Sequence, residues 1–371
     1  MRLQLLNIKT IKFSLLIIVT FLHVQLIAQH KPDSTKKLKY LIIPTLFKTP
    51  EVGIAYGVSG SFAFKTTNPK DSLTRTSIIQ GTGFLTTHHQ NVQAIDAAIY
   101  FPKENYILLT QLAHSFFPDK FWGIGPNTTD KPWERYTYEQ YYISPHIKKK
   151  ISHRFWIGAL YEFQSVYNIN YVNGGLYDSS KFSGKNKYNV SGTGLSLSYD
   201  TRNSTFWPTK GLYILSQFTD FRKELRSDFN VVKWVTDIRY FKKIQNANHI
   251  IAVQFLSYET FGQTPLRELA ALGGPNNMRG FYQGRYRAEN MLSLIAEYRL
   301  HLKGRFSSCF FGGVGDVDNH YQELNTGNLK YSYGAGLRFS ILPKEKLNIR
   351  VDYGYSSRFN RGLYVTFGEC F

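Results

Sequence analysis

The residues best suited to chemistry in this sequence lie in one stretch, residues 260–289. This stretch contains the segment GGPNNMRGFYQGRYRAEN, and it combines glycines and aromatic residues with four arginines, Arg267, Arg279, Arg285 and Arg287. A guanidinium held in a confined site needs a carboxylate partner, because an unpaired buried charge is costly. We therefore expect ion pairing that holds a folded loop. Glu297, on the polar face of the strand expected next, is the candidate partner.

Other residue patterns give only weak evidence for catalysis or metal binding. An enzyme needs a nucleophile and a base, but His114 and Ser115 are adjacent and so point to opposite faces of a strand. The pair His88 and His89 has no further metal ligand nearby, and the two cysteines lack CxxC or Cys/His spacing. We expect no enzyme activity, no cofactor and no metal site. A lipid hydrolase built into a barrel is the less favoured alternative.

Composition narrows the class of protein. The chain has 371 residues, of which 43% are hydrophobic and 16% aromatic, and its mean hydropathy is −0.29. A polytopic helical membrane protein would need several runs of about 20 apolar residues. A disordered chain would be poor in aromatic residues. The sequence therefore predicts a folded protein that does not cross a membrane with several helices.

The first segment predicts export. Arg2, Lys9 and Lys12 precede an apolar run that begins at Phe13, and small residues follow near Ala28. This order is typical of a secretory signal peptide, which we assign to residues 1–29. Export argues against nucleic acid as a partner. The net charge of +19 is therefore expected to face outer-membrane lipids, including anionic headgroups, or an aqueous lumen.

The rest of the chain alternates with a period of two. In residues 346–355, apolar side chains such as Val351 and Tyr353 alternate with polar ones such as Arg350 and Asp352, and residues 154–169 and 290–302 behave in the same way. Strands of ten or more residues with one apolar and one polar face are typical of a transmembrane β-barrel, in which the polar face points inward. A water-soluble sandwich usually has strands of about 5 to 6 residues.

Turn signals divide the chain into sixteen strands. We expect an all-β fold, a sixteen-stranded antiparallel transmembrane β-barrel over residues 39–371 with a long sixth external loop folded into the lumen, preceded by a short periplasmic segment at 30–38. The expected strands are 39–48, 52–66, 75–86, 91–101, 105–117, 136–149, 153–169, 188–200, 209–222, 229–243, 248–259, 290–302, 306–316, 329–341, 346–356 and 361–371.

These features together resemble the BamA/TamA superfamily of outer-membrane barrels, also called the bacterial surface antigen family. The long loop lies between the eleventh and twelfth expected strands, as in that family, and Arg279, Gly280 and Phe281 match the family's loop tip. Glu297 matches the family's glutamate on strand twelve. The turn DTRNSTFWPTKG resembles the family's turn before strand nine, through Asp200, Arg202, Pro208 and Gly211.

Two departures from the family pattern affect these expectations. The family's aspartate on strand thirteen would fall on Gly313, so we assign its role to Asp316, which lies one residue beyond Gly315. Members usually carry polypeptide-transport-associated domains ahead of the barrel, and residues 30–38 are too short for one. The resemblance thus implies a short member that lacks them.

The final residues resemble the assembly signal of outer-membrane barrels. Phe367 and Phe371 lie on one face of the last expected strand, and Glu369 interrupts the apolar series between them. Pro44, in the first expected strand, cannot donate to a strand ladder, which is consistent with weak pairing between first and last strands.

The resemblance implies a protein of the outer membrane of a Gram-negative bacterium that assists insertion or translocation of proteins, or handles lipids. It also implies periplasmic or outer-membrane protein partners. The main alternative is a general diffusion porin or passive channel. Porins usually constrict the lumen with the third loop, whereas the long Gly- and Arg-rich loop here is the sixth.

Overall fold

The computed structural model describes residues 38–371 apart from 69–70, 72–73, 205–206, 245–248, 325, 343–346 and 358–359. The predicted signal peptide, and all but the last residue of the predicted segment 30–38, lie outside the described residues. In the described part of the chain, no helix is long and apolar enough to cross a membrane.

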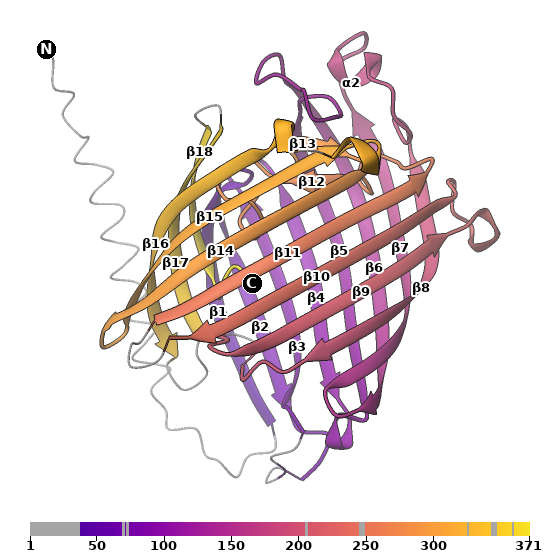
Figure 1. The fold of residues 1–371 in the computed structure, drawn as a ribbon. Helices are drawn as coiled ribbons and strands as arrows, with labels where there is room; N and C mark the ends of the chain where they lie inside the picture. The colour runs from indigo at the N-terminus through magenta and orange to yellow at the C-terminus, as the bar shows by residue number, and fades with distance from the viewer. Residues whose placement is uncertain are drawn as a thin grey trace, which may run out of the picture. The chain divides into compact units, whose positions relative to one another are not determined.

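Sixteen strands close into one antiparallel barrel (Figure 1). Each strand pairs with its neighbours in the chain, and β1 closes the ring by pairing with β18. The wall strands are β1 (Leu38–Thr49), β2 (Gly53–Phe64), β3 (Ser77–Thr86), β4 (Asn91–Tyr100), β5 (Tyr106–Phe121), β6 (Glu134–Ser152), β7 (Phe155–Asn170), β8 (Tyr188–Asp200), β9 (Gly211–Phe221), β10 (Val231–Lys243), β11 (His249–Gly262), β14 (Asn290–Lys303), β15 (Phe306–Asp318), β16 (Lys330–Leu342), β17 (Leu347–Ser356) and β18 (Asn360–Phe367).

The closed sixteen-stranded fold predicted from the sequence is confirmed, but several strand ends differ from those expected; β5, for example, continues to Phe121 instead of ending at 117. The last strand was expected to run from 361 to 371, but β18 ends at Phe367. Two short strands that the sequence did not predict, β12 (Ala270–Leu272) and β13 (Tyr286–Ala288), pair with each other inside the long connection between β11 and β14.

Along each wall strand, exposed apolar side chains alternate with side chains that face the inside of the barrel. On β17, Val351, Tyr353 and Tyr355 are exposed, whereas Arg350 and Asp352 are buried. The same division holds on β14, where Leu294 is exposed and Glu297 is buried. A closed ladder satisfies every interior backbone group, so apolar side chains can face outward along the whole wall.

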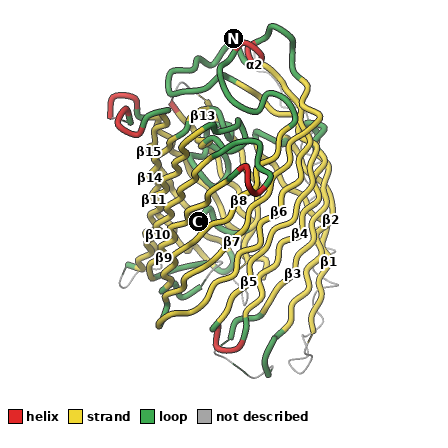
Figure 2. Tube along the Cα trace, turned by 90° about the vertical axis from the view of Figure 1, so that its right-hand side faces the viewer, coloured by secondary structure: helices red, strands yellow, loops and turns green. Residues whose placement is uncertain are grey.

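The connections lie at two ends of the wall, as Figure 2 shows. We call the end that carries the β1–β2, β5–β6, β7–β8 and β11–β14 connections the loop end, and the other end the turn end. At the loop end, α2 (Leu176–Ser179) and neighbouring segments pack into an aromatic cluster that includes Phe121, Tyr136 and Tyr177. Short 3-10 turns, η1 (Pro102–Glu104), η2 (Lys223–Leu225), η3 (Tyr321–Glu323) and η4 (Thr326–Asn328), occur in other connections.

Candidate functional site

The connection between β11 and β14, which we call loop six (residues 263–289), contacts the wall closely at its tip. Gly280 has a φ of +114°, a conformation that L side chains rarely adopt. Its neighbour across the contact is Gly354 of β17, where an added Cβ would lie 2.8 Å from the carbonyl carbon and oxygen of Arg279. Glycine at both positions therefore lets the two backbones approach each other.

The side chain of Arg279 binds two carboxylates from different strands. Its Nη2 donates to Glu297 of β14 and its Nη1 donates to Asp352 of β17. The guanidinium carbon also lies 3.6 Å from the centre of the Phe311 ring on β15. Arg279 is 1% exposed, and the side chains of both carboxylates are 0% exposed. Charge-assisted bonds of this kind are strong where water is excluded.

The structure brings Arg279 and Glu297 together, but it does not give Asp316 the role expected for it. Asp316 lies near the end of β15, and its carboxylate accepts a bond of 2.6 Å from Lys330 of β16. Asp352 provides the second carboxylate for Arg279 instead. The strand-thirteen position at which the family pattern places its aspartate is Gly313, where an added Cβ would lie 2.9 Å from the Met278 sulfur of loop six.

Three further arginines extend this contact into a buried network, which we call the arginine cluster. Its members are Arg279, Arg299, Arg338 and Arg350 with the carboxylates of Glu297, Asp352 and Glu369. Arg299 Nε donates to Glu297 at 2.7 Å, and Arg338 Nη1 donates to Asp352 at 2.5 Å. Arg350 Nη2 reaches back to loop six, to the Pro275 carbonyl at 3.2 Å. The network thus joins three wall strands to one loop.

The residues after β18 leave the wall and join this cluster, which corrects the predicted terminal signal. Gly368 has a φ of +75°, and beyond it Glu369 accepts a bond of 3.3 Å from Arg338 Nε. Phe371 is buried beside Phe241, with 6.2 Å between ring centres, so it does not continue the lipid-facing series of Phe367. A carboxylate in a lipid-facing series would be unfavourable, whereas Glu369 has cationic partners here.

The backbone of the loop tip is held from β18 and from the β1–β2 turn. The Gly280 amide donates to the Tyr364 hydroxyl at 2.9 Å, and that hydroxyl donates to the Phe281 carbonyl at 3.1 Å. The Gln283 amide donates to Glu51 at 2.7 Å. Burial raises the pKa of the Glu51 carboxyl above its usual range. These bonds join the backbone of the loop tip to β18 and to the β1–β2 turn.

Further arginines and a tyrosine of loop six bind acidic residues of β5 and of the β5–β6 connection. The Asp119 carboxylate of β5 lies 3.4 Å from Arg287 Nη2 and 3.5 Å from Arg267 Nη1. It also accepts a bond of 3.0 Å from the Tyr282 hydroxyl, whose pKa is raised chiefly by burial. Arg285 binds Asp130 at 2.8 Å, in the connection after β5. The loop therefore contacts β5 on one side and β14 and β17 on the other.

The predicted turn motif forms a compact structure at the turn end. Arg202 donates to Asp200 through Nε at 3.0 Å and through Nη2 at 2.9 Å, so the pair is bidentate. Gly211 has a φ of +114°, and an added Cβ would lie 2.5 Å from the Thr201 carbonyl. Pro208 is buried. These contacts fix the shape of the turn and do not involve loop six.

The histidine and serine residues that could catalyse a reaction lie on wall strands and not in loop six. His114 contacts Gln93 at 3.0 Å and Tyr167 at 3.2 Å rather than Ser115. A second pair, His146 with Ser196 at 2.7 Å, is buried, and sequence reasoning missed it because the two residues come from different strands. Among the described residues, no three His, Cys, Asp or Glu side chains gather as they would around a metal ion.

Comparison with known proteins gives a family and a fold. The Omp85 superfamily domain matches residues 62–369. Protein TOC75-4, chloroplastic, of Arabidopsis thaliana is 32% identical over 122 residues, 29% of this chain and 28% of that protein. Protein TOC75, chloroplastic, of Pisum sativum is 30% identical over 122 residues, 30% of this chain and 14% of that protein. The chain thus matches less than a third of the length of either relative.

Two solved structures share the architecture. BamA from Haemophilus ducreyi lacking POTRA domains 1–3 superposes with a TM-score of 0.58 at 13% identity, covering 89% of this chain and 70% of that one. CdiB from Acinetobacter baumannii superposes with a TM-score of 0.60 at 11% identity, covering 90% and 60%. At these identities the likeness shows the fold alone. The family model, by contrast, covers most of the sequence, including the loop tip and its partners, and the chain belongs to the Omp85 superfamily.

Proposed function

We propose that this chain is an outer-membrane barrel that assists the insertion or translocation of proteins, with loop six closing its lumen. The family supports the class of activity, because similar barrels include BamA and CdiB. One observation carries the proposal for this chain: the buried side chain of Arg279 binds Glu297 of β14 and Asp352 of β17. A loop tip bound in this way obstructs free diffusion.

Contacts of loop six argue against a general diffusion porin. Arg279 binds the wall at β14 and β17, and Tyr282 donates to Asp119 of β5. A porin needs a continuous aqueous path between the two ends of its barrel. Here loop six extends between opposite parts of the wall, so a path for solutes would require the loop to move.

The junction of β1 and β18 is where we propose that clients are engaged. The two strands pair with Lys48 opposite Val365. Because β18 ends at Phe367 and the following residues turn toward the arginine cluster, this register leaves the first part of β1 beyond the end of β18. Tyr40 and Ile42, in that part, are exposed. An unpaired strand edge is a template for another strand.

A cross-link across this junction tests the proposal. In a background with Cys309→Ala and Cys370→Ala, the pair Lys48→Cys and Val365→Cys should form a disulfide that closes the junction. The readout is the rate at which proteoliposomes containing this barrel promote folding of an unfolded outer-membrane barrel. We expect the rate to fall to that of empty liposomes after oxidation and to recover with reductant.

The control is a disulfide elsewhere in the wall, from Leu337→Cys and Val351→Cys, which are paired on β16 and β17. This disulfide should leave the rate unchanged. Equal rates with the junction open and closed would refute strand templating at β1. Absence of any acceleration by the wild type would refute insertion as the activity.

The proposal also covers location and partners. We propose that the barrel lies in the outer membrane of a Gram-negative bacterium, in contact with anionic lipid headgroups and with periplasmic or outer-membrane proteins. The net charge of +19 supports contact with anionic lipids. Fractionation of the source cells and capture of cross-linked partners would test these assignments.

A further inference from the structure

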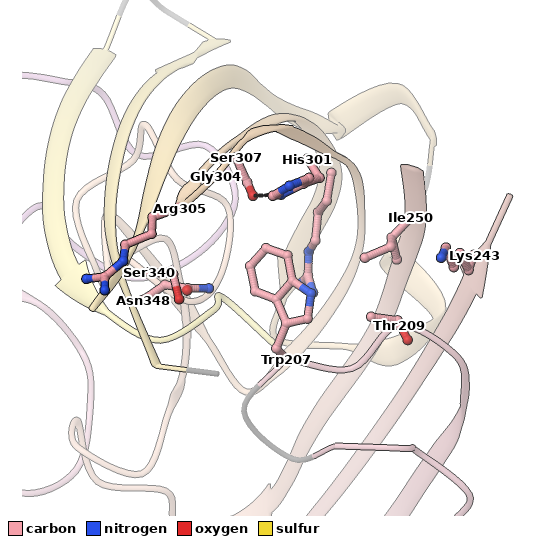
Figure 3. A pocket seen from close by; sticks show the side chains of 11 residues that line it. Trp207, Thr209, Lys243, Ile250, His301, Gly304, Arg305, Ser307, Ser340 and Asn348 are labelled. Atoms are coloured by element: carbon pink, nitrogen blue, oxygen red, sulfur yellow. Dashed lines mark hydrogen bonds between the residues drawn. The ribbon is translucent and has the colours of Figure 1, made fainter. Parts of the chain in front are cut away.

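A cavity of about 470 Å³ opens at the turn end of the barrel, next to the arginine cluster (Figure 3). Side chains of six wall strands line it, together with Trp207 and Thr209 from the β8–β9 turn. In Figure 3, Trp207 lies in the middle, with Arg305 and Asn348 on one side and Ile250 and Lys243 on the other. Its lining comes from the inner side of the wall, so the cavity faces the lumen mouth and not the lipid.

The lining of this cavity is cationic. It includes Lys243, Arg299 and Arg305, and also His301, whose Nδ1 lies 3.4 Å from the Ser307 hydroxyl. Among the described residues that line the cavity, none is a carboxylate. Several like charges around a concave surface raise the local potential and attract anions.

Arg299 lies at the base of the cavity, and its side chain is 0% exposed. Its Nε donates to Glu297 at 2.7 Å and its Nη2 donates to the backbone oxygen of Phe371 at 3.2 Å. Its Nη1 is buried and has no hydrogen-bond partner in the described part of the chain. Because this atom is closed off from the cavity, Arg299 does not bind a ligand there directly, and binding falls to the exposed cations of the rim.

The apolar part of the lining indicates that the ligand is larger than a simple oxyanion. Trp207 and Ile250 present apolar surface, whereas the amide of Asn348 already donates to Glu369 at 3.2 Å. The volume lies in the range of about 300–1,000 Å³ that is usual for ligand pockets. Carboxylates beside an apolar side chain, joined by backbone amides, match this mixture of groups.

We propose that this cavity binds a polypeptide segment that carries aspartate or glutamate side chains next to an apolar residue. The carboxylates bind Lys243 and Arg305 at the rim, and the apolar residue packs on Trp207. The assignment goes beyond the proposed function, because binding at this mouth does not depend on insertion or translocation by the barrel. The occupant is a segment of a partner protein that carries this acidic and apolar sequence.

A binding measurement on the refolded full chain in zwitterionic detergent tests this site. The probe is a dye-labelled peptide with glutamates around one phenylalanine, and its matched control carries glutamines in their place. We expect the glutamate peptide to bind at least about tenfold more tightly than the glutamine peptide. The double variant Lys243→Gln and Arg305→Gln should weaken binding about tenfold, because each partly exposed charge pair contributes modestly.

The matched control variant is Lys242→Gln with Lys303→Gln, which removes the same charge at the same end from residues that do not line the cavity. It should bind the glutamate peptide as the wild type does. Trp207→Ala removes no charge, and it should also weaken binding of the glutamate peptide. All variants must first show the heat-modifiable migration of a folded barrel.

Three results would overturn the assignment. Equal binding of the glutamate and glutamine peptides would exclude carboxylate recognition. Equal losses in the two double variants would mean that attraction to the overall charge explains the binding. Displacement of the peptide by inorganic phosphate or short-chain phosphatidylglycerol, at concentrations where free glutamate has no effect, would assign the cavity to phosphate groups instead.

Discussion

Two parts of the barrel wall use their inward-facing side chains in different ways. On β3 and β4, which we call the solvated wall, Gln80 and Asp96 are exposed, and Asp96 accepts a bond of 2.9 Å from Gln111. On β14 to β17, the packed wall, Asp352 is 0% exposed and binds three arginines. A hydrated carboxylate needs no cation, whereas a buried one does. The difference follows from loop six and residues 368–371, which cover Asp352 on the packed wall and leave Gln80 and Asp96 on the solvated wall exposed.

Loss of the Arg279 side chain should have the largest effect on this difference. Arg279→Ala leaves two buried carboxylates without their loop partner, which costs about 3–5 kcal/mol locally. We expect proteases to cleave loop six much faster, while the barrel keeps its heat-modifiable migration, because the strand ladder does not depend on Arg279. The matched change on the solvated wall, Asp96→Asn, should leave cleavage unchanged. Equal protection in the Arg279 variant would mean that other contacts hold the loop.

A methyl group at the backbone contact should have the next largest effect. Gly354→Ala places a Cβ 2.8 Å from the Arg279 carbonyl, and overpacking of this kind costs about 1–3 kcal/mol. Amide hydrogen exchange at residues 278–282 should therefore become faster. Gly81→Ala on β3 is the control, since an added Cβ there meets nothing within 4 Å. Equal exchange rates at residues 278–282 in the Gly354 and Gly81 variants would contradict a tight backbone contact.

A double-mutant cycle measures the ion pair itself. Arg279→Ala and Glu297→Gln should show a coupling energy of about 0.5–3 kcal/mol in loop protection, because both remove one contact. Glu297 also binds Arg299, so its single variant should have an effect of its own. Arg279→Ala with Asp96→Asn should be additive within about 0.5 kcal/mol. Additivity in the first pair would contradict direct interaction.

Protonation of Glu51 should have the smallest effect. Burial raises its pKa, so the native state binds this proton more tightly than the unfolded state does. The resulting stabilisation is present in full below the ordinary pKa of 4.5 and is lost as the pH rises through the raised value. Exchange of the Gln283 amide, which binds Glu51, should thus slow as the pH falls, after correction for intrinsic rates. Glu51→Gln should remove this pH dependence. If the pH dependence persists in that variant, another titrating group causes it.

Sequence reasoning identified the strands because alternation is a local pattern. Lipid outside and polar groups inside require the period of two in each strand, so residues such as Val351 and Arg350 could be assigned to faces without knowing the neighbours. The family-like loop tip pointed to Arg279 and Glu297, which are close in sequence and lie on adjacent elements.

Sequence reasoning did not assign ion-pair partners that come close only when the chain folds. Asp352 lies 73 residues from Arg279, and the alternation of β17 gives it a face but no partner. The inward turn after Phe367 was missed because the alternating pattern continues through Glu369 and Phe371, although Gly368 with its φ of +75° interrupts the strand. A carboxylate within an apolar series was the signal that could have revealed this turn.

Conductance in planar bilayers tests most directly whether Arg279 keeps the lumen closed. Wild-type barrels should show small, fluctuating currents, and Arg279→Ala should give larger and longer openings. Asp96→Asn, on the solvated wall, should behave as the wild type does. Large, steady currents from the wild type, or identical currents from Arg279→Ala, would contradict closure of the lumen by this side chain.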